Sequence, residues 1–146
     1  MMNYTNEITI NLPREQVAEL FSDPAQIKQW QPTFQTMKHI SGEPGQAGAK
    51  SSMVYLEGKR EMTLIETILV NNLPDEFTAT YETAGVYNLQ KNYFYAEGDK
   101  TRWVSETEFK FSGFMRIIGF FMRGAFVKQS NKIMDDFKAF AESKSV

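Results

Sequence analysis

The sequence predicts an α+β fold with a seven-stranded antiparallel sheet, two short helices between the first two strands and one long C-terminal helix. Residues 4–12 and 33–111 alternate between apolar and polar side chains, as half-buried strands do. The connections within 33–111 are short, which favours antiparallel neighbours. Residues 114–143 repeat apolar side chains at helical spacing. With 146 residues and no linker or internal repeat, we expect a single domain covering 1–146.

The chain opens with a strand and two short helices. We expect the strand at Tyr4–Leu12 and the first helix at Arg14–Ser22, directly after a proline. A second short helix starts with Asp23 as its N-cap and Pro24 in its first turn, and runs to Trp30.

Six further strands follow, separated by segments rich in Gly, Pro, Asn and Asp, which favour turns. We expect these strands at Thr33–Gly42, Ala49–Glu57, Arg60–Val70, Glu76–Thr83, Val86–Ala96 and Thr101–Phe111.

The last hairpin is the most informative part of the sheet, because its Glu97–Lys100 turn fixes the register. Pairing outward sets Tyr95 opposite Arg102 and Lys91 opposite Glu106, which is typical of a solvated face. The inner face then carries three aromatic and five amide or hydroxyl side chains: Phe94, Trp103, Phe109, Asn88, Gln90, Asn92, Ser105 and Thr107. Each buried polar group without a partner costs about 1–3 kcal/mol, so this face predicts a ligand cavity rather than a solid core.

The same pairing rule extends to the earlier turns. It sets Tyr81 opposite Asn88 and Met53 opposite Leu64, although a slip of one residue would invert the faces. The additional side chains that we expect to line the cavity are Met53, Tyr55, Met62, Leu64, Glu66, Phe77 and Tyr81.

Glu66 and Tyr81 are the candidate catalytic residues. If Glu66 points into an apolar cavity, its pKa is raised and it can serve as acid, base or ligand anchor. A register slip or an ion pair with a nearby cation would instead make Glu66 structural. Tyr81 can offer its hydroxyl to a ligand or an enolate, or simply pack with the hydroxyl at the rim. His39, the only histidine, has no partner motif, which favours a surface or rim position.

Composition excludes several classes of protein. A net charge of −2 without a basic run argues against nucleic acid as a partner. There is no cysteine and no metal-binding or phosphate-binding motif, so we expect neither a metal nor a cofactor. The N-terminus lacks the features of a signal peptide, and no apolar window is long enough to span a bilayer. We therefore expect a cytoplasmic protein without stable membrane insertion.

The segment Phe114–Phe126 is apolar on nearly every side and contains Gly119 and Gly124, which favour a bend. It has three interpretations. As a cover for the cavity mouth it would bring Phe121 to the ligand, as a dimer contact it would make the protein a homodimer, and as an interfacial helix it would touch membranes reversibly.

The chain resembles the START/Bet v 1-like (SRPBCC) superfamily, and within it the bacterial polyketide cyclase/dehydrase-like proteins. The resemblance rests on Asp23-Pro24-Ala25 with Trp30, Gly48-Ala49-Lys50, Thr101-Arg102-Trp103 and the Phe126–Phe137 helix. It implies the helix-grip fold, in which a curved sheet wraps around the last helix with a ligand cavity between them. Members of this superfamily bind lipids, sterols, hormones, polyketides and aromatic compounds, and a minority are enzymes.

These observations favour a protein that binds a small hydrophobic or aromatic, partly polar molecule. One alternative is a cyclase/dehydrase-like enzyme, in which Glu66 moves a proton while Tyr81 with Asn88 or Asn92 stabilises an enolate oxygen. Another is a protein-interaction or membrane-contact module that uses Phe114–Phe126.

Overall fold

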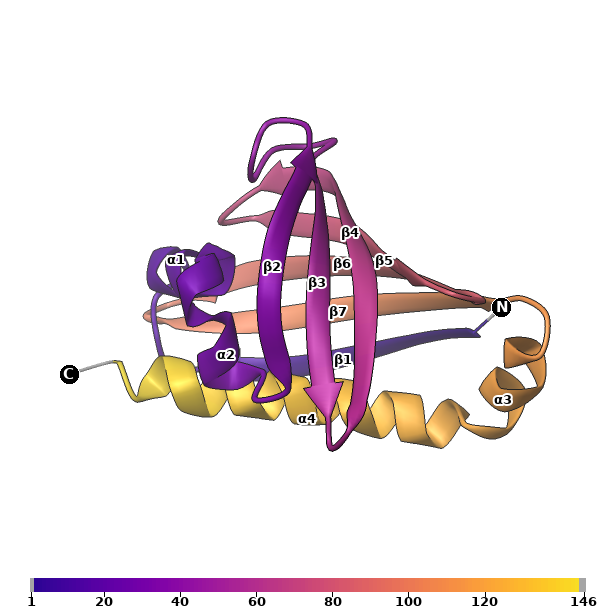
Figure 1. Cartoon of the computed structure of the whole chain (residues 1–146). Helices are drawn as coiled ribbons and strands as arrows, with labels where there is room; N and C mark the ends of the chain where they lie inside the picture. The colour runs from indigo at the N-terminus through magenta and orange to yellow at the C-terminus, as the bar shows by residue number, and fades with distance from the viewer. Residues whose placement is uncertain (1, 145–146) are drawn as a thin grey trace.

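The computed structural model of the chain describes residues 2–144 and shows a curved antiparallel sheet with a long helix along its concave side (Figure 1). The strand order in space is β1-β7-β6-β5-β4-β3-β2, so consecutive strands from β2 to β7 are neighbours and β1 pairs with β7. The fold class predicted from the sequence is confirmed. The strands are β1 (Met2–Ile10), β2 (Phe34–Ser41), β3 (Lys50–Glu57), β4 (Arg60–Asn72), β5 (Glu76–Thr83), β6 (Val86–Glu97) and β7 (Lys100–Phe111).

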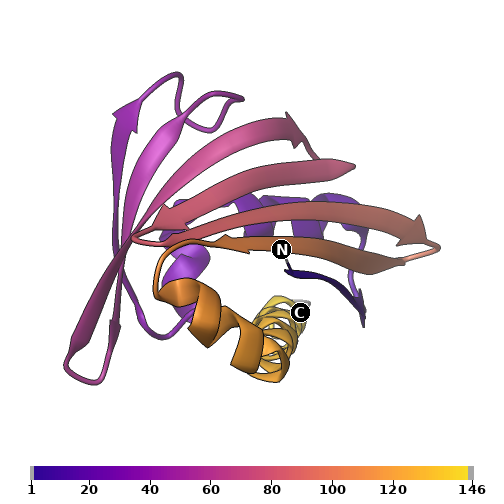
Figure 2. The same cartoon turned by 90° about the vertical axis from the view of Figure 1, so that its right-hand side faces the viewer.

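The helices lie in two groups. Between β1 and β2 come α1 (Arg14–Ser22), the 3-10 turn η1 (Pro24–Gln26) and α2 (Ile27–Trp30). After β7 come α3 (Met115–Phe121) and α4 (Arg123–Glu142). Viewed along α4, the sheet arches over this helix while α3 sits at one end of it (Figure 2).

The strand pairings predicted from the turns are confirmed. Lys91 pairs with Glu106, and Tyr95 pairs with Arg102, whose guanidinium lies 4.6 Å from the centre of the tyrosine ring. The earlier hairpins also follow the prediction, with Tyr81 opposite Asn88, Met53 opposite Leu64 and Ser51 opposite Glu66. The concave face is therefore the one that the sequence assigned to the interior.

The core is built around Phe137 of α4, which is fully buried. Its ring centre lies 4.9 Å from that of Trp30, 5.4 Å from that of Trp103 and 5.9 Å from that of Phe21. These contacts are edge-to-face, an arrangement that aromatic quadrupoles favour. The cluster joins α1, α2, β7 and α4 into one packed end of the molecule.

The first strand differs from the prediction at both ends. It runs over Met2–Ile10 rather than Tyr4–Leu12, because β7 offers partners from Phe109 to Thr101. Beyond the ladder, the Leu12 carbonyl accepts a hydrogen bond of 2.8 Å from the Thr101 hydroxyl instead.

The C-terminal segment is two helices rather than one. The break falls at Met122, whose backbone angles (φ −111°, ψ 19°) leave the helical range. In α3, Gly119 lies directly against the ring of Phe111, where an added Cβ would come within 2.5 Å of ring carbons. The bend that the two glycines predict is present, and it lies between them.

We predict that Phe137→Ala lowers the free energy of unfolding by about 3–5 kcal/mol, because it removes a buried ring and leaves a cavity among aromatic side chains. Phe120→Ala is the matched control: Phe120 is 80% exposed, so its truncation should change stability by less than about 0.5 kcal/mol. Urea unfolding followed by circular dichroism measures both. Equal stabilities for the two variants would contradict this account of the core.

Candidate functional site

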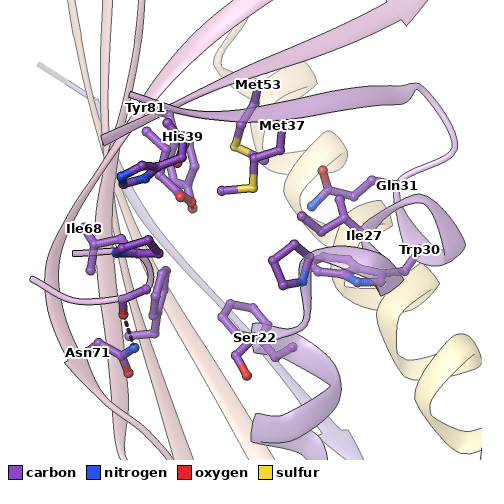
Figure 3. A pocket seen from close by; sticks show the side chains of 17 residues that line it. Ser22, Ile27, Trp30, Gln31, Met37, His39, Met53, Ile68, Asn71 and Tyr81 are labelled. Carbon is purple, nitrogen blue, oxygen red and sulfur yellow. Dashed lines mark hydrogen bonds between the residues drawn. The ribbon is translucent and has the colours of Figure 1, made fainter. Parts of the chain in front are cut away.

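A cavity of about 310 Å³ opens between strands β2–β5 and the segment α1–α2 (Figure 3). This volume is at the lower end of the range of about 300–1,000 Å³ that is typical of small-molecule sites. Its lining comes from Phe21, Ser22, Pro24, Ile27, Trp30 and Gln31 on the helical side, Met37, His39, Ser51, Met53, Glu66, Ile68, Phe77 and Tyr81 on the sheet, and Pro44, Gly45 and Asn71 at one edge.

Strand alternation brings the sheet residues to one face, since side chains two positions apart point the same way. Strand β4 departs from this rule at a bulge, where the register shifts between Ile68 and Val70. Because of this bulge, Asn71 rather than Val70 lines the cavity. The Asn71 amide donates a hydrogen bond of 2.5 Å to the Gly45 carbonyl, which ties the loop between β2 and β3 to the sheet (Figure 3).

Glu66 and Tyr81 form the polar centre of the cavity. They face each other across β4 and β5, and the Tyr81 hydroxyl donates a hydrogen bond of 2.9 Å to the Glu66 oxygen Oε2. Glu66 is 7% exposed although it lines the cavity. Close by, the Tyr55 hydroxyl donates to the Gln31 side-chain oxygen at 2.6 Å and so connects β3 with the end of α2. Tyr81 lies across the cavity from Ile27 (Figure 3).

Burial shifts the pKa values of Glu66, Tyr81 and Tyr55. It raises the pKa of Glu66 above its ordinary value of 4.5, and the hydrogen bond from Tyr81 opposes that rise without cancelling it. Burial also raises the pKa of Tyr81 and of Tyr55, and the charge of Glu66 adds to both. Both phenols therefore remain protonated at neutral pH and act as hydrogen-bond donors.

The cavity contains an acidic side chain, Glu66, but no lysine or arginine to pair with it. Glu66 and His39 are the only lining residues other than tyrosine with ionisable side chains, and no lysine or arginine is among them. Within residues 2–144, Glu66 makes no ion pair. A buried carboxyl group of this kind must be protonated, hydrogen-bonded or paired with a positive group. A hydrogen-bond donor of a ligand can therefore serve as a further partner of Glu66.

Four of the predicted cavity residues line the cavity: Met53, Glu66, Phe77 and Tyr81. Tyr55 lies next to it and packs edge-on against Phe34 at 5.7 Å between ring centres. Met62 and Leu64 lie further along β4, where Met62 is 40% exposed and Leu64 is half-buried. The pairing of these strands is as predicted, but the cavity ends before it reaches them.

The polar residues of the last hairpin point inward but do not line the cavity. Asn92 accepts a hydrogen bond of 3.0 Å from the Trp103 indole, and Gln90 donates one of 2.9 Å to Asn88. The Asn88 amide in turn donates to the Glu108 carbonyl at 3.2 Å. Ser105 and Thr107 are also buried on this face. Three of the five thus bond to protein groups, and all five lie outside this cavity; that they orient a ligand stays a prediction.

Four other aromatic residues that were expected to line the cavity lie outside it. Phe94 and Trp103 stack on each other within the core, with ring centres 5.8 Å apart. Phe109 packs against Phe126 of α4 at 4.9 Å. Phe121 is 76% exposed on α3, and no residue of α3 lines the cavity. The cavity therefore lies between the sheet and α1–α2 rather than between the sheet and the C-terminal helix, and α3 does not cover it.

Sequence reasoning did not identify the helical side of the cavity. Phe21 and Trp30 fit a helical apolar pattern, which indicates burial without saying what covers it. Met37 and His39 share a face of β2, but β2 is an edge strand whose position depends on β3. His39 is exposed and lies at the cavity, consistent with the predicted rim position.

Metal sites and membrane-spanning helices are two further classes of feature that bear on function. Among residues 2–144, no group of three or more His, Cys, Asp or Glu side chains is placed to hold a metal ion. None of the helices in this range has both the length and the apolar character needed to cross a membrane.

Comparison with known proteins agrees with this fold. A family model described as "Polyketide cyclase / dehydrase and lipid transport" matches residues 1–142. No curated protein sequence matches the chain significantly.

Similar solved structures cover nearly the whole chain. The crystal structure of Ara h 8.0201 has a TM-score of 0.79 at 12% identity, covering 98% of this chain and 99% of that one. The protein TTHA0849 from Thermus thermophilus has a TM-score of 0.74 at 18% identity, covering 99% and 100%. Norcoclaurine synthase from Thalictrum flavum, in complex with dopamine and hydroxybenzaldehyde, has a TM-score of 0.70 at 15% identity, covering 98% and 87%. At these identities the likeness is one of fold.

We predict that the stability of the wild-type protein falls relative to Glu66→Gln as the pH rises above 4.5. Below this value Glu66 is protonated in both the folded and the unfolded chain. Above it the unfolded chain loses its proton first, so stability falls with rising pH until the raised pKa of the folded state is passed, and then stays at the lower value.

Urea unfolding at a series of pH values between 4 and 8 measures the difference. Glu61→Gln, an exposed acid on the same strand, is the control and should track the wild type. A gap between wild type and Glu66→Gln that is constant with pH would contradict the burial of Glu66.

Proposed function

The chain belongs to the polyketide cyclase/dehydrase and lipid transport family, and from this premise we propose that it binds a small hydrophobic or aromatic, partly polar molecule between β2–β5 and α1–α2. The observation that carries the proposal is a largely apolar cavity with one buried carboxyl group, Glu66, held by Tyr81. Such a site combines apolar contact with directional polar contact centred on Glu66, which is the usual composition of a small-molecule pocket.

The polar end of the ligand should be a hydrogen-bond donor and is best matched by a cationic nitrogen. Glu66 can accept from such a group, and the lining offers no lysine or arginine that would hold an anion. The aromatic rings of Phe21, Trp30 and Phe77 provide apolar walls that also attract cations. The norcoclaurine synthase complex contains dopamine and hydroxybenzaldehyde, which are small aromatic molecules with polar groups. This likeness in fold supports the ligand size and class.

We predict that phenethylamine binds more tightly than phenethyl alcohol, and that phenylpropionate binds most weakly. Glu66→Gln should weaken the amine roughly tenfold, which corresponds to about 1.4 kcal/mol, because it removes the negative charge. The same change should leave the affinity for the alcohol within a few-fold. Isothermal titration calorimetry at neutral pH gives all six values.

Two tryptophan variants of α1 test the location. Ser22 is exposed and lines the cavity, so Ser22→Trp should obstruct its mouth and abolish binding. Gln16, exposed on the same helix, does not line the cavity, so Gln16→Trp should bind as the wild type does. Absence of binding for all three compounds, or binding that Ser22→Trp does not change, would contradict the proposal.

A second candidate function is acid–base catalysis, favoured by the hydrogen bond between Tyr81 and Glu66. A carboxylate whose pKa is raised by burial is a stronger base than an exposed one, and a phenol at 2.9 Å can turn its donor toward an enolate oxygen. Asn92 is already occupied by Trp103, and Asn88 donates to a backbone carbonyl. The enolate would therefore depend on Tyr81.

The enzyme hypothesis predicts that the protein accelerates exchange of the α-protons of benzyl methyl ketone for deuterium in heavy water. Glu66 removes the proton, and a deuteron returns to the same carbon from Glu66 after exchange with solvent. Glu66→Gln should abolish the acceleration and Tyr81→Phe should reduce it roughly tenfold to a hundredfold, with ketone affinity within a few-fold in both. Proton NMR follows the reaction, and exchange at the buffer rate with wild-type protein would exclude this activity.

A further inference from the structure

Helix α3 and the two residues that flank it carry the largest concentration of exposed apolar side chains among the described residues. We define the α3 patch as Phe114 (73% exposed), Ile117 (57%), Phe120 (80%), Phe121 (76%) and Met122 (46%). The other exposed large apolar side chains, such as Ile40 on β2 and Tyr95 on β6, lie scattered over the sheet. The helix lies at one end of the molecule, past the ends of the strands (Figure 1). A contiguous apolar surface of this kind on a globular domain indicates a contact site.

The patch follows from the helical spacing of its residues and from the way α3 packs on the sheet. Residues three or four positions apart share a helix face, so Phe114, Ile117 and Phe121 project together. On the opposite side, Gly119 is buried against Phe111. A surface helix usually turns its apolar side chains toward the core, but α3 turns its smallest residue toward the protein and its large apolar residues outward.

The charges around the patch bear on the kind of surface that it would contact. Between residues 110 and 132 the chain has five basic residues and no acidic one, although its net charge is −2; the last of the five, Lys132, is paired with Asp136 at 2.6 Å. Arg116 and Lys128 are exposed, while Arg123 donates a hydrogen bond of 2.9 Å to the Asn3 carbonyl and fixes the start of α4 to β1. An apolar surface beside exposed basic side chains such as Arg116 and Lys128 is complementary to an anionic lipid surface.

A second copy of the chain fits the patch less well. A symmetric dimer would place the same surface of both copies face to face. Arg116 would then approach basic groups of its partner with no acid in the segment to neutralise them. The charge pattern therefore favours lipid over self-association.

We propose that the α3 patch docks reversibly on anionic membranes, with its phenylalanines in the interfacial layer and Arg116 and Lys128 at the lipid phosphates. One short helix provides limited apolar area, so binding is weak, reversible and sensitive to salt. Because no residue of α3 lines the cavity, docking is separate from ligand binding.

The test is sedimentation with vesicles of phosphatidylcholine alone and of an equal mixture with phosphatidylglycerol. Wild-type protein should bind the anionic vesicles and be released by high salt, and it should not bind phosphatidylcholine. Phe120→Asp with Phe121→Asp should weaken binding roughly tenfold or more, because two aromatic contacts are lost and two negative charges added. Arg116→Gln with Lys128→Gln should also weaken binding and reduce its dependence on salt.

Ile40→Asp is the matched control, since Ile40 is 53% exposed on β2 and far from α3 in the chain. It should bind vesicles as the wild type does, and circular dichroism should show that every variant is folded. Wild-type protein that stays in the supernatant with anionic vesicles overturns the proposal, as does binding that the aspartate pair leaves unchanged. Sedimentation equilibrium that shows a dimer converted to a monomer by the aspartate pair, without lipid binding, assigns the patch to self-association instead.

Discussion

Phe137 connects parts of the chain that are more than a hundred residues apart, and the cavity depends on this connection. Its ring on α4 touches Phe21 of α1, Trp30 of α2 and Trp103 of β7. Because these contacts hold α1–α2 against the packed end of the sheet, the opposite side of the same segment faces β2–β5. Phe21 and Trp30 belong to both regions, since they touch the core ring and also line the cavity. The cavity on one side of α1–α2 therefore depends on the close packing of the aromatic core on the other side.

Polar side chains on the concave face fall into two classes. Under α4 they bond to protein groups: Tyr4 bonds with Ser130 at 2.8 Å, and the Asn6 amide nitrogen donates to Asn131 at 2.6 Å, although the Asn6 side-chain oxygen has no partner. Glu66 has only the Tyr81 hydroxyl and no positive partner within residues 2–144. An acid buried in this way destabilises the fold at neutral pH, as its raised pKa indicates. An uncharged side chain at this position would give a more stable core, so stability alone does not account for Glu66.

The sequence predicted the sheet well because hairpin register is a local property. The turn after Glu97 fixes Lys91 opposite Glu106, and the turn at Gly85 fixes Tyr81 opposite Asn88, without knowledge of the rest of the fold. The location of the cavity could not be predicted in the same way. It depends on where α1–α2 lies over the sheet, which is decided by long-range contacts such as that between Trp30 and Phe137. Periodicity shows that a face is buried, but it does not show which element covers it.

The exposure of the α3 side chains follows from the space between this helix and β7. Gly119 is in contact with Phe111 so closely that even one methyl group would collide with the ring. If α3 turned its phenylalanines inward, the helix would have to move away from β7 by the width of an aromatic ring. Close approach through a glycine is therefore incompatible with burying Phe120 or Phe121 in the same place. The large side chains face outward because the packing that holds α3 to the sheet uses the one position without a side chain.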